Sequence, residues 1–195
     1  MFEKVQQKVH KGWSTGKKIL AWMSVWGLIF SLVTIGRLHV AFDYDDTLVF
    51  STPAFNKAFK SGAQPFSPDF WTVVNQSYDL EEPKLMTTTF AWILRVFGFR
   101  ISILASRPPD GGDALKKEWR HLVSQFIFVP DAERKHVYLG QSHYVLYFSD
   151  SDTDIAQGRL AHVLALRIRR SPKSSYKEDY HPGTLGEIVI PFSEY

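Results

Sequence analysis

The sequence predicts an α/β domain in which a parallel sheet is covered by helices on both faces. Its 195 residues suit one domain of ordinary size, and 45% hydrophobic against 22% charged residues excludes a disordered chain. Apolar strand-like runs alternate with helical patterns, which is typical of parallel sheets. The absence of cysteine excludes disulfide scaffolds, thiolate metal sites and cysteine nucleophiles. A net charge of +3 is too small to indicate a protein that binds nucleic acid.

The first element is the uncharged run Ile19–Gly36, which has lysines before it and Arg37 after it. Eighteen residues reach the lower limit of a membrane-spanning helix. Three interpretations stay open, namely a helix packed on the domain or at a subunit interface, a membrane anchor, and a signal peptide. The packed helix is favoured because a strand-like run begins at Leu38, and a strand at the centre of a soluble sheet can hardly begin at a bilayer surface. We expect 1–36 to be an N-terminal segment and 37–195 the main domain.

The remaining elements alternate between strands and helices. Runs rich in branched and aromatic residues predict four strands, Leu38–Asp43, Arg100–Ala105, Tyr144–Phe148 and Leu164–Ile168. Apolar periodicity between and after them predicts four helices, Pro83–Val96, Asp113–Val123, Ala132–Leu139 and Thr153–Val163. In such a sheet the functional site lies beyond the carboxyl ends of the strands.

Acidic residues cluster at two of these carboxyl ends. Asp43 and Asp45 follow the first strand, and an extended backbone would point both the same way. A second cluster, which contains Asp150, Asp152 and Asp154, follows the third predicted strand. Carboxylates this close repel one another unless a cation or a phosphoryl group lies among them. Oxygen ligands suit Mg²⁺ rather than zinc or copper.

These motifs resemble a known family. The pattern Asp43-x-Asp45-x-Thr47 after an apolar strand is similar to the first motif of the haloacid dehalogenase-like (HAD) phosphohydrolases. Within that superfamily the stretch from Val40 to Phe55, the run from Asp150 to Ile155 and the C-terminal Ser-Glu-Tyr resemble the bacterial class B acid phosphatases. The resemblance implies a Rossmannoid three-layer sandwich with a central, mainly parallel sheet, an N-terminal helix and a small helical cap inserted around residues 50–82.

The resemblance also implies roles for the acidic residues. Asp43 looks like the nucleophile that forms an aspartyl-phosphate, and Asp45 like the general acid that protonates the leaving alcohol. Mg²⁺ would be held by Asp43, by the backbone carbonyl of Asp45 and by Asp150. Asp154 looks like a supporting carboxylate, either behind the metal or paired with a lysine. Lys135 lies at the family's spacing before Asp150 and looks like the cation that binds the phosphoryl group.

The second motif departs from the family pattern. The superfamily places serine or threonine after the second main strand, where its hydroxyl binds the phosphate. Aligning Arg107 with the family's arginine puts Ala105 at that position, and Ser106 beside it. We lean toward Ser106 as the phosphate ligand, and we expect Arg107 to compensate through a bidentate phosphate contact.

Three aromatic residues, Phe55, Trp71 and Tyr176, occupy positions where the family lines the pocket for the leaving group. Core packing is the alternative for each of them. The basic run Arg167–Arg170 is interpreted as a strand end with a solvated face.

Together these features predict a Mg²⁺-dependent acid phosphatase that acts on nucleotides and on aryl and other organic phosphomonoesters, with phosphate transfer to alcohols as a further activity. One alternative is a weakly active or inactive member that binds phosphorylated ligands, and another is a protein that oligomerises or anchors through its apolar helix. By resemblance we expect a periplasmic homotetramer. A membrane-anchored or a cytoplasmic location is the alternative.

Overall fold

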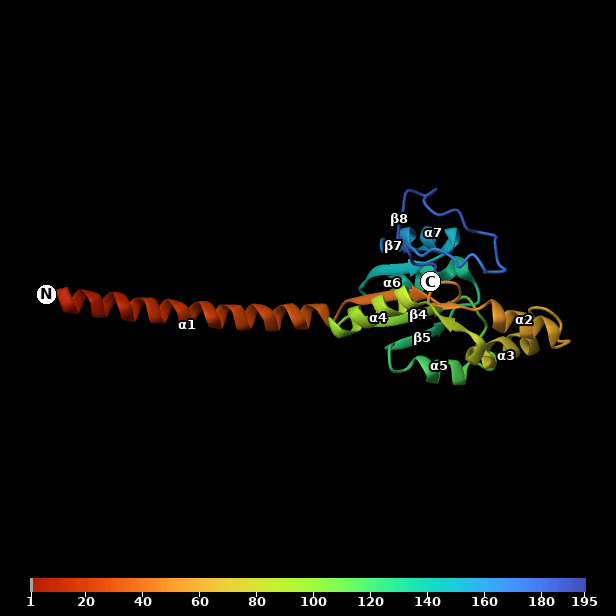
Figure 1. The fold of residues 1–195 in the computed structure, drawn as a ribbon, viewed down its shortest axis with the longest axis horizontal. Coiled ribbons are helices and arrows are strands. Elements are labelled where there is room, and N and C mark those ends of the chain that lie inside the picture. The colour runs from red at the N-terminus through yellow and green to blue at the C-terminus, as the bar shows by residue number, and fades with distance from the viewer. Residues whose placement is uncertain (1) are drawn as a thin grey trace. The chain divides into compact units, whose positions relative to one another are not determined.

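The computed structural model describes residues 2–195, with the side chains of residues 17–195 apart from position 32. The chain divides into two units, residues 1–37 and 38–195. In the first unit, helix α1 (Phe2–Ile35) is drawn in red in Figure 1. Its described side chains from 17 to 34 are exposed, and the stretch Lys17–Ile35 is long and apolar enough to cross a membrane. A signal sequence near an N-terminus has the same properties, so the three interpretations of this segment stay open.

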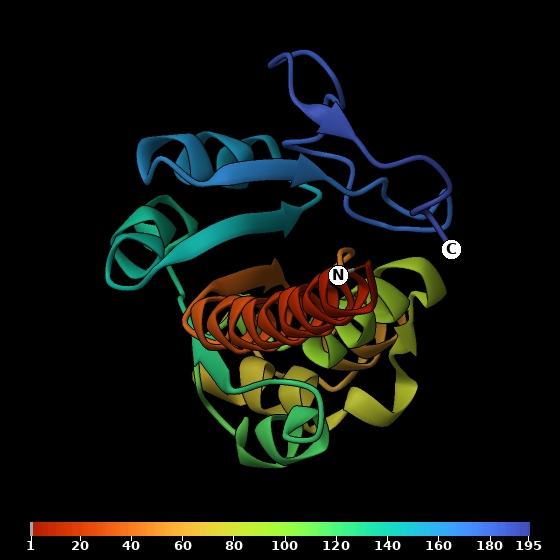
Figure 2. The same cartoon turned by 90° about the vertical axis from the view of Figure 1, so that its left-hand side faces the viewer.

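The second unit is built on a six-stranded sheet in which every pair of neighbouring strands is parallel. Figure 2 shows part of this sheet, with two of its strands running side by side in the same direction. The strand that carries the first acidic motif lies inside the sheet and is buried along its whole length, which explains its continuous apolar run. In spatial order the strands are β5 (Gln125–Phe128), β4 (Arg100–Ala105), β1 (His39–Asp43), β6 (Tyr144–Ser149), β7 (Leu164–Arg167) and β8 (Ile188–Val189).

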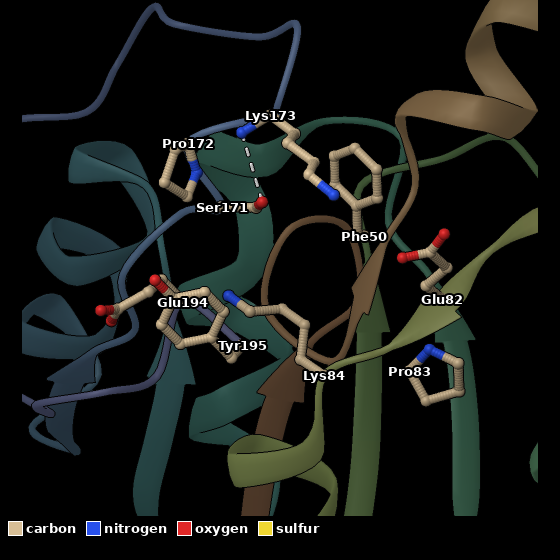
Figure 3. A pocket seen from close by; sticks show the side chains of 9 residues that line it. All are labelled: Phe50, Glu82, Pro83, Lys84, Ser171, Pro172, Lys173, Glu194 and Tyr195. Atoms are coloured by element: carbon tan, nitrogen blue, oxygen red, sulfur yellow. Dashed lines mark hydrogen bonds between the residues drawn. The ribbon is translucent and has the colours of Figure 1, made fainter.

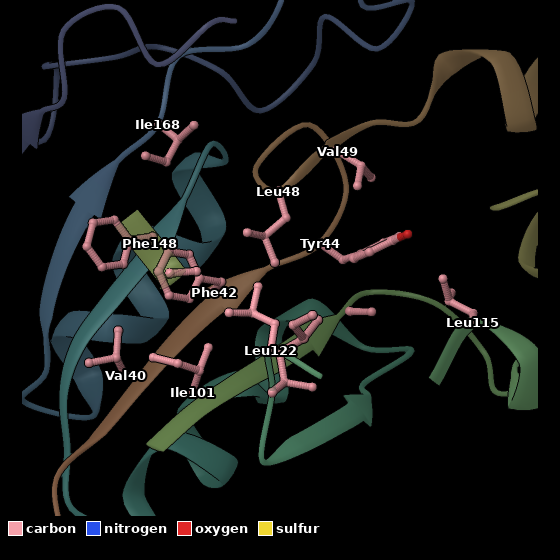
Figure 4. Close-up of a cluster of buried hydrophobic side chains, with 14 residues drawn as sticks. Val40, Phe42, Tyr44, Leu48, Val49, Ile101, Leu115, Leu122, Phe148 and Ile168 are labelled. Carbon is pink, nitrogen blue, oxygen red and sulfur yellow. The ribbon is translucent and has the colours of Figure 1, made fainter. Parts of the chain in front are cut away.

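Helices cover both faces of the sheet, so the predicted three-layer α/β architecture is confirmed. On one face, α4 (Leu85–Val96) and α5 (Asp113–Trp119) pack on a cluster that includes Phe42 of β1 and Leu115 of α5 (Figure 4). On the other face, α6 (Lys135–Gly140) and α7 (Asp152–Leu160) cover a second cluster. Side chains alternate between these faces along each strand, and this alternation decides which of them reach the site.

A helical insertion follows β1. It lies between two short antiparallel strands, β2 (Val49–Phe50) and β3 (Glu82–Pro83). The insertion contains α2 (Thr52–Lys60), α3 (Pro68–Gln76) and the 3₁₀ turn η1 (Tyr78–Leu80). The hydroxyl of Ser67 accepts a hydrogen bond from the backbone N–H of Phe70 (3.3 Å) and caps α3, while Pro68 fits its first turn. Helices α2 and α3 share an apolar cluster of their own.

Several predicted boundaries are wrong, each for a local reason. Strand β8 escapes prediction because it has only two residues, and β5 because it is a short, partly exposed edge strand. Pro83 pairs with β2 instead of opening α4. The predicted helix Asp113–Val123 ends at Trp119. The third predicted helix begins as the 3₁₀ turn η2 (Ala132–Arg134), and α7 stops before His162, whose φ is 57°.

Candidate active site

The carboxyl ends of β1 and β6 bring the two acidic clusters to the same edge of the sheet. Asp43 is the last residue of β1, and Asp150 directly follows β6. The two strands are parallel neighbours, with Phe42 opposite Phe148. Asp43 and Asp150 are 5% and 4% exposed, so both carboxylates are buried.

Lys135 pairs with the first cluster, at the start of α6. Its side chain is fully buried, and its Nζ donates hydrogen bonds to Oδ1 of Asp43 (2.5 Å) and to Oδ2 of Asp154 (2.7 Å). Burial alone would lower the pKa of Lys135, but the two carboxylates raise it above its ordinary value. The lysine is therefore a fixed positive charge beside the carboxylate of Asp43.

Asp154 holds the lysine in place. It lies in the first turn of α7, where the hydroxyl of Ser151 caps its backbone N–H (3.1 Å). Its Oδ2 also accepts hydrogen bonds from the hydroxyls of Tyr147 and Ser149, each at 2.7 Å. Of the two expectations for Asp154, the structure favours the pairing with lysine. The hydroxyls of Tyr147 and Ser149 thus fix the carboxylate that binds Lys135.

Asp150 is held by groups that the sequence interpretation missed. Thr47 donates to its Oδ1 (2.9 Å), and Nε of Arg170 donates to its Oδ2. A guanidinium nitrogen of Arg167 donates to the backbone carbonyl of Asp150 (2.5 Å) and another to Oδ1 of Asp152 (2.7 Å). Arg167 and Arg170 are 0% and 6% exposed, so their interpretation as a solvated strand end is wrong.

Asp45 is bound by Arg107. The guanidinium donates to both oxygens of Asp45, at 2.9 and 2.5 Å, and also to Oε1 of Glu81 (2.6 Å) and Oδ1 of Asn75 (3.3 Å). Tyr44 donates to the other oxygen of Glu81. Arg107 is fully buried, and the two carboxylates overcome the effect of burial and raise its pKa. Four hydrogen bonds to protein groups engage most of the donors of Arg107, so its bidentate phosphate contact stays a prediction.

The second motif lies on β4, next to β1. Asp43 is opposite Leu104, so these side chains share a face of the sheet. Ala105 points to the opposite face, where it is fully buried in the apolar cluster of Figure 4. Ser106 follows the end of β4, is partly exposed, and its hydroxyl forms no hydrogen bond with any residue that the structure describes. Ala105 is thus turned away from Asp43, and Ser106 stays the expected phosphate ligand.

The structure brings together two of the three predicted pocket aromatics. Phe55 and Trp71 pack edge to face, with ring centroids 5.9 Å apart, and the Phe55 ring lies 5.4 Å from the guanidinium carbon of Arg107. Tyr176 is 52% exposed and its ring lies 4.8 Å from the guanidinium carbon of Arg170. Phe55 and Tyr176 therefore contact two different site arginines, and Trp71 packs on Phe55.

The donor groups fit a magnesium ion. Burial raises the pKa of Asp43 well above its ordinary value, Lys135 lowers it, and the charges of Asp154 and Asp150 raise it again. A bound cation would offset this repulsion, and Oδ2 of Asp43 forms no hydrogen bond within the described part of the chain. No three His, Cys, Asp or Glu side chains among the described residues lie close enough to hold a metal unaided. A set of two carboxylates, a backbone carbonyl and waters is typical of Mg²⁺.

Comparisons with known proteins agree with this geometry. Class B acid phosphatases from Klebsiella pneumoniae (strain 342) and Edwardsiella ictaluri (strain 93-146) are each 30% identical to the chain, over 190 and 195 residues. Each alignment covers 89% of this chain, and 80% and 79% of the respective relatives. No family model matches the chain.

Solved structures show the same fold. A predicted phosphoglycolate phosphatase from Haemophilus somnus 129PT has a TM-score of 0.57 at 14% identity, covering 80% of this chain and 95% of that one. CbbY from Rhodobacter sphaeroides in complex with phosphate also has a TM-score of 0.57, at 11% identity, covering 81% and 95%. The fold is thus that of the HAD-like phosphatases. Among these the chain belongs to the class B acid phosphatases, and it is a phosphoric monoester hydrolase.

Proposed function

We propose that this phosphatase transfers the phosphoryl group of its substrate to Asp43 and then to water, with Mg²⁺ as cofactor. The observation that supports this most is the buried contact between Asp43 and Lys135 at the end of β1. A carboxylate nucleophile needs a fixed orientation and a nearby positive charge to approach an anionic phosphate. Lys135 supplies both, since it binds one oxygen of Asp43 and leaves the other without a partner in the described chain.

In the first step an oxygen of Asp43 attacks phosphorus and the bond between phosphorus and the ester oxygen breaks. Asp45 donates a proton to that oxygen, so the alcohol leaves uncharged. In the second step water attacks phosphorus, Asp45 accepts the proton of the water, and the bond between Asp43 and phosphorus breaks. Asp43 returns as a carboxylate and inorganic phosphate leaves. Another alcohol in place of water would give phosphate transfer.

Asp45 suits the acid–base role because it is more accessible than the other site carboxylates. A quarter of its side chain is exposed, against 7% for Asp43. Arg107 fixes the carboxylate through two hydrogen bonds, and Glu81 in turn fixes Arg107. Ser106 would bind a phosphoryl oxygen from the neighbouring strand end.

Mg²⁺ would be held by Asp43, by the backbone carbonyl of Asp45 and by Asp150. The ion would supply charge neutralisation between the nucleophile and the phosphate. Thr47 and Arg170 orient Asp150 for this purpose.

Substrate, location and assembly extend the proposal by resemblance. Phe55 and Trp71 on the helical insertion, together with Tyr176 on the C-terminal segment, would contact a flat nucleoside or aryl leaving group. The insertion around 50–82 would then act as a small cap on the domain 37–195. We propose a periplasmic enzyme that assembles as a homo-oligomer, with residues 1–36 as the packing or oligomerisation segment.

Trapping the covalent intermediate tests the mechanism. The protein is mixed with ³²P-labelled p-nitrophenyl phosphate and Mg²⁺, quenched in acid and treated with hydroxylamine, which releases phosphate from acyl phosphates. We expect label that is sensitive to hydroxylamine in the wild type and in Asp69→Asn, an exposed control on α3, but none in Asp43→Asn. Wild-type turnover without any trapped label, at quench times shorter than one turnover, would contradict the covalent step.

A further inference from the structure

A cavity of about 310 Å³ lies beside the catalytic carboxylates without including any of them. It is bounded by the antiparallel pair β2 and β3, by the loop that follows β7, and by the C-terminal residues (Figure 3). Its volume is at the lower end of the range for sites that bind small molecules. The residues that line it are Phe50, Glu82, Pro83, Lys84, Ser171, Pro172, Lys173, Glu194 and Tyr195.

Lys84 is a buried ammonium group in the wall of this cavity. It is 3% exposed, and its Nζ donates to the backbone carbonyls of Asp46 (2.7 Å) and Arg169 (2.6 Å). No carboxylate of the described residues lies within ion-pair distance of this nitrogen. An ammonium has three donors, so one N–H of Lys84 has no partner among the described residues. The carboxylates of Asp150, Asp46 and Glu194 act on this charge only from beyond ion-pair distance.

Two further donors face the same space. Figure 3 shows the amine of Lys173 and the hydroxyl of Ser171 on the opposite side of the opening from the amine of Lys84. The oxygen of Ser171 accepts a hydrogen bond from the backbone N–H of Lys173 (3.3 Å), which leaves the hydroxyl proton available. Three donors around one opening, two of them cationic, form a site for an anion.

Two carboxylates in the wall of the cavity favour an anion with a single negative charge. Glu82 and Glu194 also line the cavity and balance the two lysines, so a phosphate dianion would meet more repulsion than a carboxylate. Phe50 and Tyr195 supply aromatic surface next to the donors. A flat ring that carries one carboxylate matches both features.

We propose that this cavity binds a small aromatic carboxylate, whose oxygens accept hydrogen bonds from Lys84, Lys173 and Ser171 and whose ring packs on Phe50. Lys84 also holds the carbonyl of Asp46, three residues after Asp43, so the ligand would stabilise the loop that carries the first acidic motif. The site is thus a binding site for an effector, separate from the reacting groups.

Benzoate is a suitable probe, and benzamide is its uncharged control of nearly the same shape. Binding to the full-length protein is measured by isothermal titration calorimetry. We expect millimolar binding of benzoate and at least tenfold weaker binding of benzamide. Lys173→Gln should weaken benzoate about fivefold, whereas Lys117→Gln, an exposed lysine on α5, should leave it unchanged. Lys84→Met should abolish binding where that variant folds.

Equal affinity for benzoate and benzamide, or equal benzoate affinity in the wild type and in Lys173→Gln, would overturn the proposal. A requirement for Lys135 instead of Lys173, tested in Lys135→Met, would place benzoate at the catalytic carboxylates and overturn it as well. No turnover enters these measurements, so failure of the covalent mechanism would not affect them.

Discussion

The second motif offers the sharpest test of the site, because substitutions at the adjacent residues Ala105 and Ser106 should have different effects on activity and stability. If Ser106 binds the phosphoryl group, Ser106→Ala removes a hydrogen bond to a charged oxygen. Such bonds contribute about 1.5–3 kcal/mol. Since each 1.36 kcal/mol corresponds to a tenfold change in rate, kcat/KM should fall by about 10- to 150-fold. The fold should be unaffected, because the hydroxyl is partly exposed and has no partner among the described residues.

Ala105→Thr should behave in the opposite way. Ala105 is fully buried on the face of β4 that packs against the apolar core, away from Asp43. Threonine would add a methyl and an unpaired hydroxyl there, and overpacking of this kind costs about 1–3 kcal/mol. For a chain of this size, that loss corresponds to a melting temperature lower by about 2–12 °C. No gain in activity should accompany it.

Both variants are compared with the wild type by steady-state kinetics on p-nitrophenyl phosphate with Mg²⁺, and by thermal unfolding followed by circular dichroism. The reasoning is refuted if Ala105→Thr raises kcat/KM about tenfold while Ser106→Ala stays within threefold of the wild type. That result would place the residue at position 105 on the phosphate and show that the strand-face argument is wrong.

Three further predictions concern the acidic residues. Asp43→Asn should abolish turnover with an unchanged circular dichroism spectrum, and turnover within tenfold of the wild type would exclude Asp43 as nucleophile. Asp150→Ala should weaken Mg²⁺ binding in calorimetry far more than Asp152→Ala, since only Asp150 follows β6 directly beside Asp43. Equal Mg²⁺ affinities of the two variants would mean that Asp150 is not the ligand. Burial, followed by the charge of Asp150, raises the pKa of Asp46 to about 6. The folded state therefore binds this proton more tightly than the unfolded chain does, and the free energy of unfolding falls as the pH rises from about 4 to about 6. In urea titrations with EDTA, Asp46→Asn should therefore be more stable than the wild type by up to about 3 kcal/mol above pH 6, but not at pH 4, and parallel stability curves would contradict this.

The sequence could predict the main strands and the acidic edge because both depend on local patterns. A central parallel strand is apolar at every position, as in β1, and this pattern needs no knowledge of the rest of the chain. Acidic residues directly after two such strands must meet at one edge, since parallel neighbours end on the same side. The short strand β8 carries no such pattern, because two residues are too few to show alternation.

The partners of the carboxylates could not be predicted in the same way. Arg107 and Asp45 are 62 residues apart, and Arg170 and Asp150 are 20 apart, with no fixed periodicity that joins them. A basic run at a strand end looks solvated because arginine usually is. Only the fold shows that Arg170 turns inward, and that Arg107 is occupied by Asp45 and Glu81.

Three cations from different parts of the chain hold the carboxylates of the site, and this arrangement links activity to folding. Lys135 binds Asp43 from the start of α6, while Arg107 and Arg170 reach their partners from the segments that follow β4 and β7. Because the three come from separate segments, the charge pattern exists only once the sheet has formed. Removing one cation leaves a buried carboxylate unpaired, which costs about 3–5 kcal/mol. Loss of a cation should therefore reduce stability and turnover together, whereas Asp43→Asn leaves Lys135 paired with Asp154 and separates the two effects.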